Sequence, residues 1–133
     1  MNYDPDKSPD PTAWLETDEG ERLIIIERFH RRQCEAAPSP KLHALMHLVV
    51  ENQLAMPDQA AVQGALARLL NEGLQRHDAI HAIGSVLAQH LFAAMQDTPR
   101  GPDPNATYDA ALNELTAARW RASIGPGFPH EDM

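Results

Sequence analysis

Apolar residues recur at helical spacing along most of this chain, with intervals of three and four residues. The stretch 41–55 is apolar nearly all round, which is typical of a helix surrounded by other helices. It is therefore expected to be the central element. The full pattern predicts four main helices, over about 18–33, 41–55, 59–72 and 75–96.

Three consecutive isoleucines at 24–26 are the main competing signal, because β-branched residues favour strands. Polar residues flank this run on both sides, and Leu23, Ile26 and His30 fall on one face of a helix. A strand here would also have no second β-rich segment with which to pair. We therefore predict a helix over 18–33 and an all-α protein.

Proline, glycine and aspartate mark the ends of the predicted helices within a single helical domain over 1–133. Asp10 is expected to cap one short helical turn that begins at Pro11. The expected architecture is an irregular four-helix bundle with accessory N- and C-terminal helices. Its parts are a flexible arm over 1–10, a bundle core over 11–96, a linker over 97–104, an accessory helix over 105–122 and a tail over 123–133.

Composition and charge exclude several classes of function. The chain has 133 residues and a formal net charge of −8, so a nucleic-acid backbone would repel it. No apolar run approaches the roughly 18 residues that a membrane-spanning helix needs. The N-terminus lacks the pattern of a signal peptide and Cys34 has no internal disulfide partner, so a cytoplasmic location is expected.

Seven histidines are an unusually large number for a chain of this length. His43 and His47 lie four residues apart, with Glu51 four further on, so their side chains project along one stripe of the central helix. His77 and His81 repeat this spacing on the helix over 75–96. Small residues follow the second pair, so another helix can approach closely, and the two pairs are expected to face each other.

A third helix adds candidate ligands, because Glu27 and His30 have the spacing with which helical bundles present a carboxylate and an imidazole together. Buried histidines need partners for both ring nitrogens, and a metal ion would satisfy several of them at once. Neutral imidazole suits iron and zinc. The sequence thus predicts an iron or zinc site from His43, His47, His77, His81, Glu51, Glu27 and His30, and it assigns no catalytic residue.

A metal-free protein is the alternative. In that case the histidines form a hydrogen-bonded polar layer in the core. The acidic surface and the helix over 105–122, which carries Tyr108 and Trp120, would then dock a protein partner or a second copy of the chain. The sequence leaves both hypotheses open, and with them the question of enzymatic activity.

Two segments also resemble a known family. The stretches 42–54 and 76–81 contain the patterns LHxxxH and RHxxxH, with His43 and His47 in one and His77 and His81 in the other. They resemble the two signature helices of a small bacterial all-helical family classed only as a domain of unknown function. The resemblance covers roughly residues 18–96 and leaves both tails outside. It implies a bacterial cytosolic protein and no particular activity.

Overall fold

The computed structural model describes residues 2–32, 39–95 and 104–124, and these residues form helices without any strand. The isoleucines at 24–26 lie inside a helix, which confirms the all-α class. None of the described helices is both long enough and apolar enough to cross a membrane. The helices are α1 (Pro11–Glu16), α2 (Glu19–Arg32), α3 (Pro40–Ala55), α4 (Ala60–Asn71), α5 (Arg76–Met95), α6 (Pro104–Glu114) and α7 (Ala117–Ile124).

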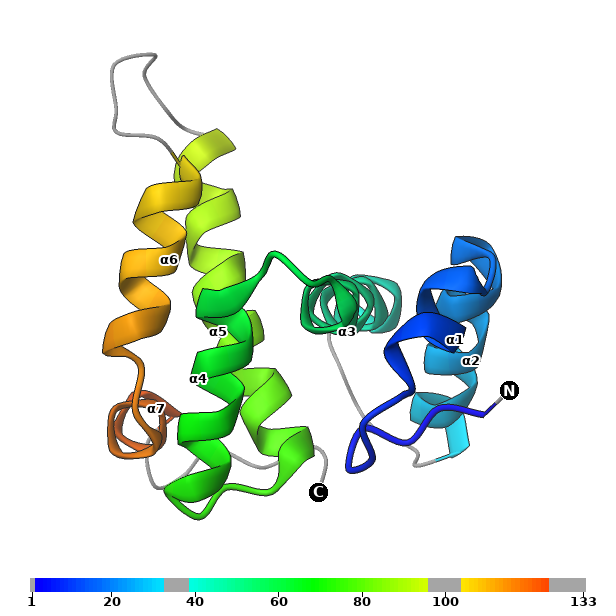
Figure 1. The fold of residues 1–133 in the computed structure, drawn as a ribbon, viewed down its shortest axis with the longest axis horizontal. Helices are drawn as coiled ribbons and strands as arrows, with labels where there is room; N and C mark the ends of the chain where they lie inside the picture. The colour runs from blue at the N-terminus through cyan, green and yellow to red at the C-terminus, as the bar shows by residue number, and fades with distance from the viewer. Residues whose placement is uncertain (1, 33–38, 96–103, 125–133) are drawn as a thin grey trace.

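Helix α3 is the central element, as its apolar sequence predicts. It contacts α1 and α2 on one side and α4 and α5 on the other, and Figure 1 shows it end-on between these two groups. Helix α6 packs against α4 and α5. One part of the core therefore lies between α4, α5 and α6, and a second part lies between α3 and the N-terminal helices.

Capping residues define the ends of several helices. The Asp10 carboxylate accepts a hydrogen bond from the Ala13 amide, and the Ser39 side chain accepts one from the Leu42 amide. A proline occupies the first helical position after each cap, where its missing N–H costs nothing. Gly73 follows α4 with a φ of 103°, a conformation that favours glycine. The boundaries of the four main helices thus agree closely with the prediction.

The C-terminal region differs from the single accessory helix predicted over 105–122, because α6 and α7 are separate helices. Thr116 lies at the break, and its hydroxyl oxygen accepts a hydrogen bond from the Arg119 amide at 3.1 Å. The Glu72 carboxylate accepts from the Ala117 amide at 2.7 Å. These two acceptors satisfy the first amides of α7 and make the chain begin a new helix.

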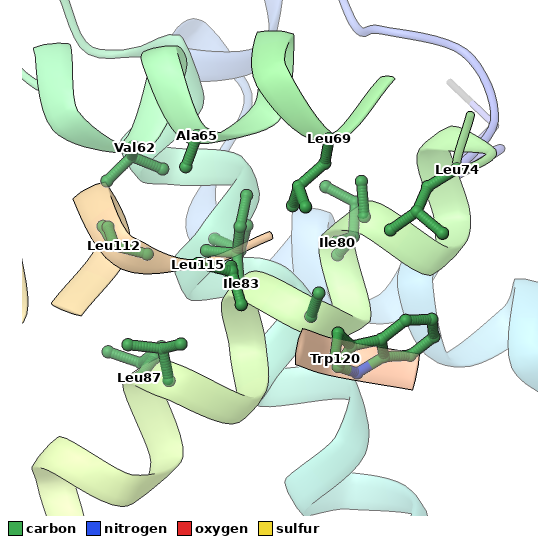
Figure 2. Close-up of a cluster of buried hydrophobic side chains, with 14 of the residues drawn as sticks. Val62, Ala65, Leu69, Leu74, Ile80, Ile83, Leu87, Leu112, Leu115 and Trp120 are labelled. Carbon is green, nitrogen blue, oxygen red and sulfur yellow. The ribbon is translucent and has the colours of Figure 1, made fainter. Parts of the chain in front are cut away.

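Helix α6 also belongs to the main bundle, because Leu112 is fully buried. Figure 2 shows this part of the core, with side chains from four helices pointing toward one another. The side chains labelled in Figure 2 are Val62, Ala65, Leu69, Leu74, Ile80, Ile83, Leu87, Leu112, Leu115 and Trp120.

The predicted linker over 97–104 and tail over 123–133 lie almost entirely outside the described residues.

The flexible arm predicted over residues 1–10 needs correction, because residues 2–10 are anchored to the helices. Tyr3 is only 3% exposed, and its ring centroid lies 5.9 Å from those of both Trp14 and Phe29. Pro5 is buried as well, and its carbonyl accepts a hydrogen bond from Arg76 at 2.9 Å. Composition suggested a loose segment, but the contacts of two buried side chains offset the entropy of ordering it.

Candidate metal centre

The two histidine pairs face each other across the contact between α3 and α5. Gly84 of α5 packs directly on Met46 of α3, and a Cβ atom at position 84 would overlap the Met46 side chain. Near this contact, Nε2 of His47 and Nε2 of His81 are 3.1 Å apart. The expected juxtaposition of the pairs is therefore present in the structure.

His30 of α2 completes a cluster of five imidazole rings. Its ring centroid lies 4.6 Å from that of His43 and 4.5 Å from that of His47. The rings of His77 and His81 are also 4.5 Å apart. Within this five-histidine cluster, two groups of three each have their potential ligand atoms within 4.8 Å of one another. The groups are His30, His43 and His47, and His47, His77 and His81, so His47 belongs to both.

The hydrogen bonds around His47 define its tautomer. The Tyr3 hydroxyl donates its proton to Oε2 of Glu51 at 2.7 Å, so the same oxygen must accept from Nδ1 of His47 at 3.0 Å. His47 therefore carries its hydrogen on Nδ1 and keeps a lone pair on Nε2, the atom that faces His81. An outer hydrogen bond of this kind is typical of histidines that bind metals.

His30 is oriented in the same manner. Its Nδ1 lies 2.8 Å from the Ile26 carbonyl oxygen, and because a carbonyl can only accept, the ring must donate from Nδ1. The lone pair of His30 is therefore on Nε2, which is shielded from solvent. Two of the five rings thus have a defined metal-binding nitrogen before any ligand is considered.

A buried ion pair lies directly behind His47. Glu51 is 1% exposed and receives two hydrogen bonds of 2.8 Å from the two terminal nitrogens of Arg76, which is 7% exposed. Burial alone would lower the pKa of Arg76, but the bonds and charge of Glu51 outweigh it and raise that pKa. The pair is electrically neutral, and with Tyr3 it holds His47 in position.

The two carboxylates predicted as ligands are not in either group of three histidines. Glu51 is engaged with Arg76 and Tyr3, as described above. Glu27 is partly buried on α2, and its carboxylate lies 3.8 Å from the Lys41 ammonium. Among the described residues, the groups suited to a metal ion therefore consist of histidine alone.

Burial keeps four of the five clustered imidazoles uncharged near neutral pH. Desolvation, together with the neighbouring histidines, lowers the pKa of His43 to about 4. Desolvation also lowers the pKa of His77 to about 4, that of His47 well below its usual range, and that of His30 in the same direction. Neutral imidazole is the form that binds a metal ion, so the rings are in the correct state.

The ring nitrogen Nε2 of His77 is the clearest position for a ligand. Its backbone amide donates to Oδ1 of Asp6 at 3.0 Å, but its Nε2 is buried without a hydrogen-bond partner in the described part of the chain. An unsatisfied buried nitrogen costs about 1–3 kcal/mol. A metal ion bound at this nitrogen would remove that penalty.

A cavity of about 790 Å³ adjoins the cluster, with His77 in its wall. The N-terminal arm forms much of the lining, and Tyr3, Trp14 and Phe29 contribute aromatic rings. Phe29 also packs edge-on against the rings of His30 and His77. The cavity therefore borders the buried histidines on the side of α2 and the arm.

Sequence reasoning missed Tyr3 and Arg76. A glutamate in an otherwise apolar helix indicates that a buried cation lies nearby, and this signal could have led to Arg76. Nothing in the composition of residues 1–10 indicated that Tyr3 would reach the central helix. His90 lies outside the five-histidine cluster, where its Nδ1 donates to the Val86 carbonyl and its ring packs against Tyr108.

The fold and this site define an all-α bundle protein with a buried histidine cluster. The chain belongs to the family described as the domain of unknown function DUF1841, whose family model matches residues 13–114. This match confirms the resemblance to a helical family of unknown function and extends beyond residues 18–96 at both ends. Comparisons with curated proteins and with solved structures found no match.

Proposed function

We propose that this protein binds iron or zinc as a divalent ion through its five-histidine cluster. The observation that carries the proposal is the state of His47, which belongs to both groups of three and presents an unprotonated Nε2 to His81. Two imidazole nitrogens bound to one zinc ion at about 2.1 Å and tetrahedral angles are about 3.4 Å apart. The observed 3.1 Å needs only a small adjustment.

The cost of burying uncharged imidazoles, at His30, His47 and His77, supports the same function. These rings occupy the contact between α2, α3 and α5, where apolar side chains would stabilise the bundle without needing partners. A metal-bound state recovers this cost, because binding free energy adds to folding free energy. We therefore expect the metal to stabilise the protein as well as to occupy the site.

The alternative is a metal-free interaction module, which explains the short contact between His47 and His81 as a hydrogen bond. In that case Nε2–H of His81 donates a hydrogen bond to Nε2 of His47. However, the aromatic residues expected to dock a partner are packed inside the bundle, since Tyr108 and Trp120 are each only 7% exposed. This burial supports the metal-binding proposal over docking through these two residues.

Elemental analysis by plasma mass spectrometry tests the proposal. Tag-free protein is measured before and after dialysis against EDTA, and the melting temperature is recorded for both samples. We expect one or two equivalents of iron or zinc, lost on chelation together with a fall in melting temperature. Metal-free protein that binds neither added ion, with unchanged melting, would overturn the proposal and favour the hydrogen-bonded core.

Histidine variants sharpen this test. His47→Ala should abolish binding at both groups, whereas His90→Ala is the matched control because His90 lies on α5 outside the cluster. Comparing His43→Ala with His81→Ala then identifies the group in use. Loss only in His43→Ala assigns the ion to the group with His30, and loss only in His81→Ala assigns it to the group with His77.

A further inference from the structure

The cavity beside the N-terminal arm meets the histidine cluster at His77. Its volume of about 790 Å³ is within the range common for small-molecule sites. Arg32 and Lys7, both exposed, belong to its lining, so the space is accessible from solvent. His77 therefore connects a buried set of possible metal ligands with a space that a small molecule can enter.

The charge balance of the cluster determines what kind of molecule would bind there. Three neutral imidazoles contribute no charge, and the buried carboxylate of Glu51 is already neutralised by Arg76. A divalent ion held by His47, His77 and His81 would keep both of its positive charges. An uncompensated buried charge is costly, so a negatively charged ligand on the ion would be strongly favoured.

The cavity lining does not supply enough negative charge to replace such a ligand. It contains three carboxylates, from Asp4, Asp6 and Asp10, and two cations, from Lys7 and Arg32. Their formal sum is one negative charge, against two positive charges on the ion. Once the ion is bound, a net attraction for an anion would therefore remain beside the cavity.

From this balance we infer that an ion held by His47, His77 and His81 takes a small monoanion as an additional ligand, which enters through the cavity lined by Arg32. The inference rests on the proposed function, because it requires a bound metal. Three protein ligands with one position left for a small molecule is the arrangement of metal sites that carry out chemistry. Sites closed by four protein ligands are structural instead.

Azide binding to protein loaded with Co²⁺ tests this inference, because Co²⁺ has visible absorption bands that depend on its coordination. The Co²⁺ content is measured first, and azide is then added at low ionic strength, with perchlorate, which coordinates metal ions only weakly, as a control for salt. We expect a saturable change in the visible spectrum with one azide per bound ion. A chain that holds Co²⁺ but shows no spectral change in a large excess of azide would overturn the inference and leave the proposed function intact.

Charge variants on α2 test whether the anion binds on the side of the cavity. Arg32 lines the cavity and Arg31 does not, although both are exposed. Arg32→Glu should weaken azide binding roughly threefold to fivefold at low salt, as expected for reversing one charge at about 10 Å in water. Arg31→Glu should have little effect, and Co²⁺ content should be unchanged in both. Equal azide affinities in the two variants would contradict binding of the anion on the side of this cavity. Unmodified protein that does not bind Co²⁺ at all would instead contradict the proposed function.

Discussion

The hydroxyl group of Tyr3 lies 3.0 Å from Nδ1 of His47, so the third residue of the chain directly contacts the centre of the histidine cluster. Because this hydroxyl gives its proton to Glu51, it can only accept from His47. One hydrogen bond thus determines which nitrogen of His47 is available to a metal ion. The N-terminal arm is therefore part of the candidate site rather than an appendage to the bundle.

Replacing Tyr3 with phenylalanine should reduce metal affinity about 10- to 100-fold, the range typical for loss of an outer hydrogen bond to a metal-binding histidine. It should also cost about 1–3 kcal/mol of stability, because Glu51 and His47 each lose a buried partner. Metal affinity is measured by competition with a chromogenic chelator.

The matched control is Tyr108→Phe, which removes the same group from a hydroxyl that bonds to Gln53 away from the cluster. This variant should lose some stability and keep its metal affinity. Equal losses of affinity in the two tyrosine variants would mean that Tyr3 acts only through general stability.

Removing the charge of Arg76 should destabilise the protein by about 3–5 kcal/mol, because Arg76→Gln leaves the Glu51 carboxylate buried and unpaired. Urea unfolding at pH 7 measures this loss. The double variant Arg76→Gln with Glu51→Gln should recover much of it, since the unpaired charge is then absent.

An exposed ion pair in the same protein provides the comparison. Nη1 of Arg119 lies 3.7 Å from Oε1 of Glu114, and both side chains are about 70% exposed. Arg119→Gln should therefore change stability by less than about 0.5 kcal/mol. A similar small effect at Arg76 would show that the buried pair is not a source of stability.

Lowering the pH should destabilise the metal-free protein. The unfolded chain binds protons at His43 and His77 near pH 6.5, whereas burial lowers both pKa values to about 4 in the folded protein. The unfolded state therefore binds more protons in this interval, so stability is complete above about pH 7 and falls as the pH drops toward 4. Each histidine should contribute about 2–3 kcal/mol to this fall.

Urea unfolding at several pH values between 7 and 4.5 measures this effect. His77→Gln cannot be protonated, so it should show a shallower dependence on pH than the unmodified protein. A metal-free protein with constant stability over this interval would contradict the neutral, desolvated state of these rings.

Adding a methyl group at Gly84 should disturb the cluster from a distance. The new Cβ would overlap the Met46 side chain, so α3 and α5 must separate or Met46 must shift. Gly84→Ala is therefore expected to cost about 1–3 kcal/mol and to weaken metal binding, because His47 and His81 lie on the same two helices. Thermal unfolding and metal titration measure both effects.

Gly64 of α4 is the matched glycine, because a Cβ there would meet nothing within 4 Å. Gly64→Ala should stabilise the protein by about 0.5–1 kcal/mol through its greater helix propensity. Combining Gly84→Ala with Met46→Ala should restore metal binding, which would show that the effect of position 84 is steric. Normal metal binding by Gly84→Ala alone would argue against close helix contact as the requirement.

Local spacing was sufficient to predict the helices and the histidine stripes. Periodicity along the chain determines which side chains share a helix face, and for His43 and His47, or His77 and His81, no knowledge of other helices is needed. The same reasoning failed at Thr116, where two hydrogen bonds divide the predicted helix. One acceptor is the hydroxyl of Thr116 itself, and the other is the carboxylate of Glu72, which is distant in sequence.

The tertiary structure decided which histidine stripes meet and which side-chain atoms are available to a metal ion. Gly84 of α5 packs against Met46 of α3, and Glu51, which the sequence offered as a metal ligand, is instead paired with Arg76. The position of Tyr3 was equally beyond prediction, because its partners lie 44 and 48 residues away. Such pairings depend on packing and loop closure over long separations, for which the order of apolar and polar residues carries no local signal.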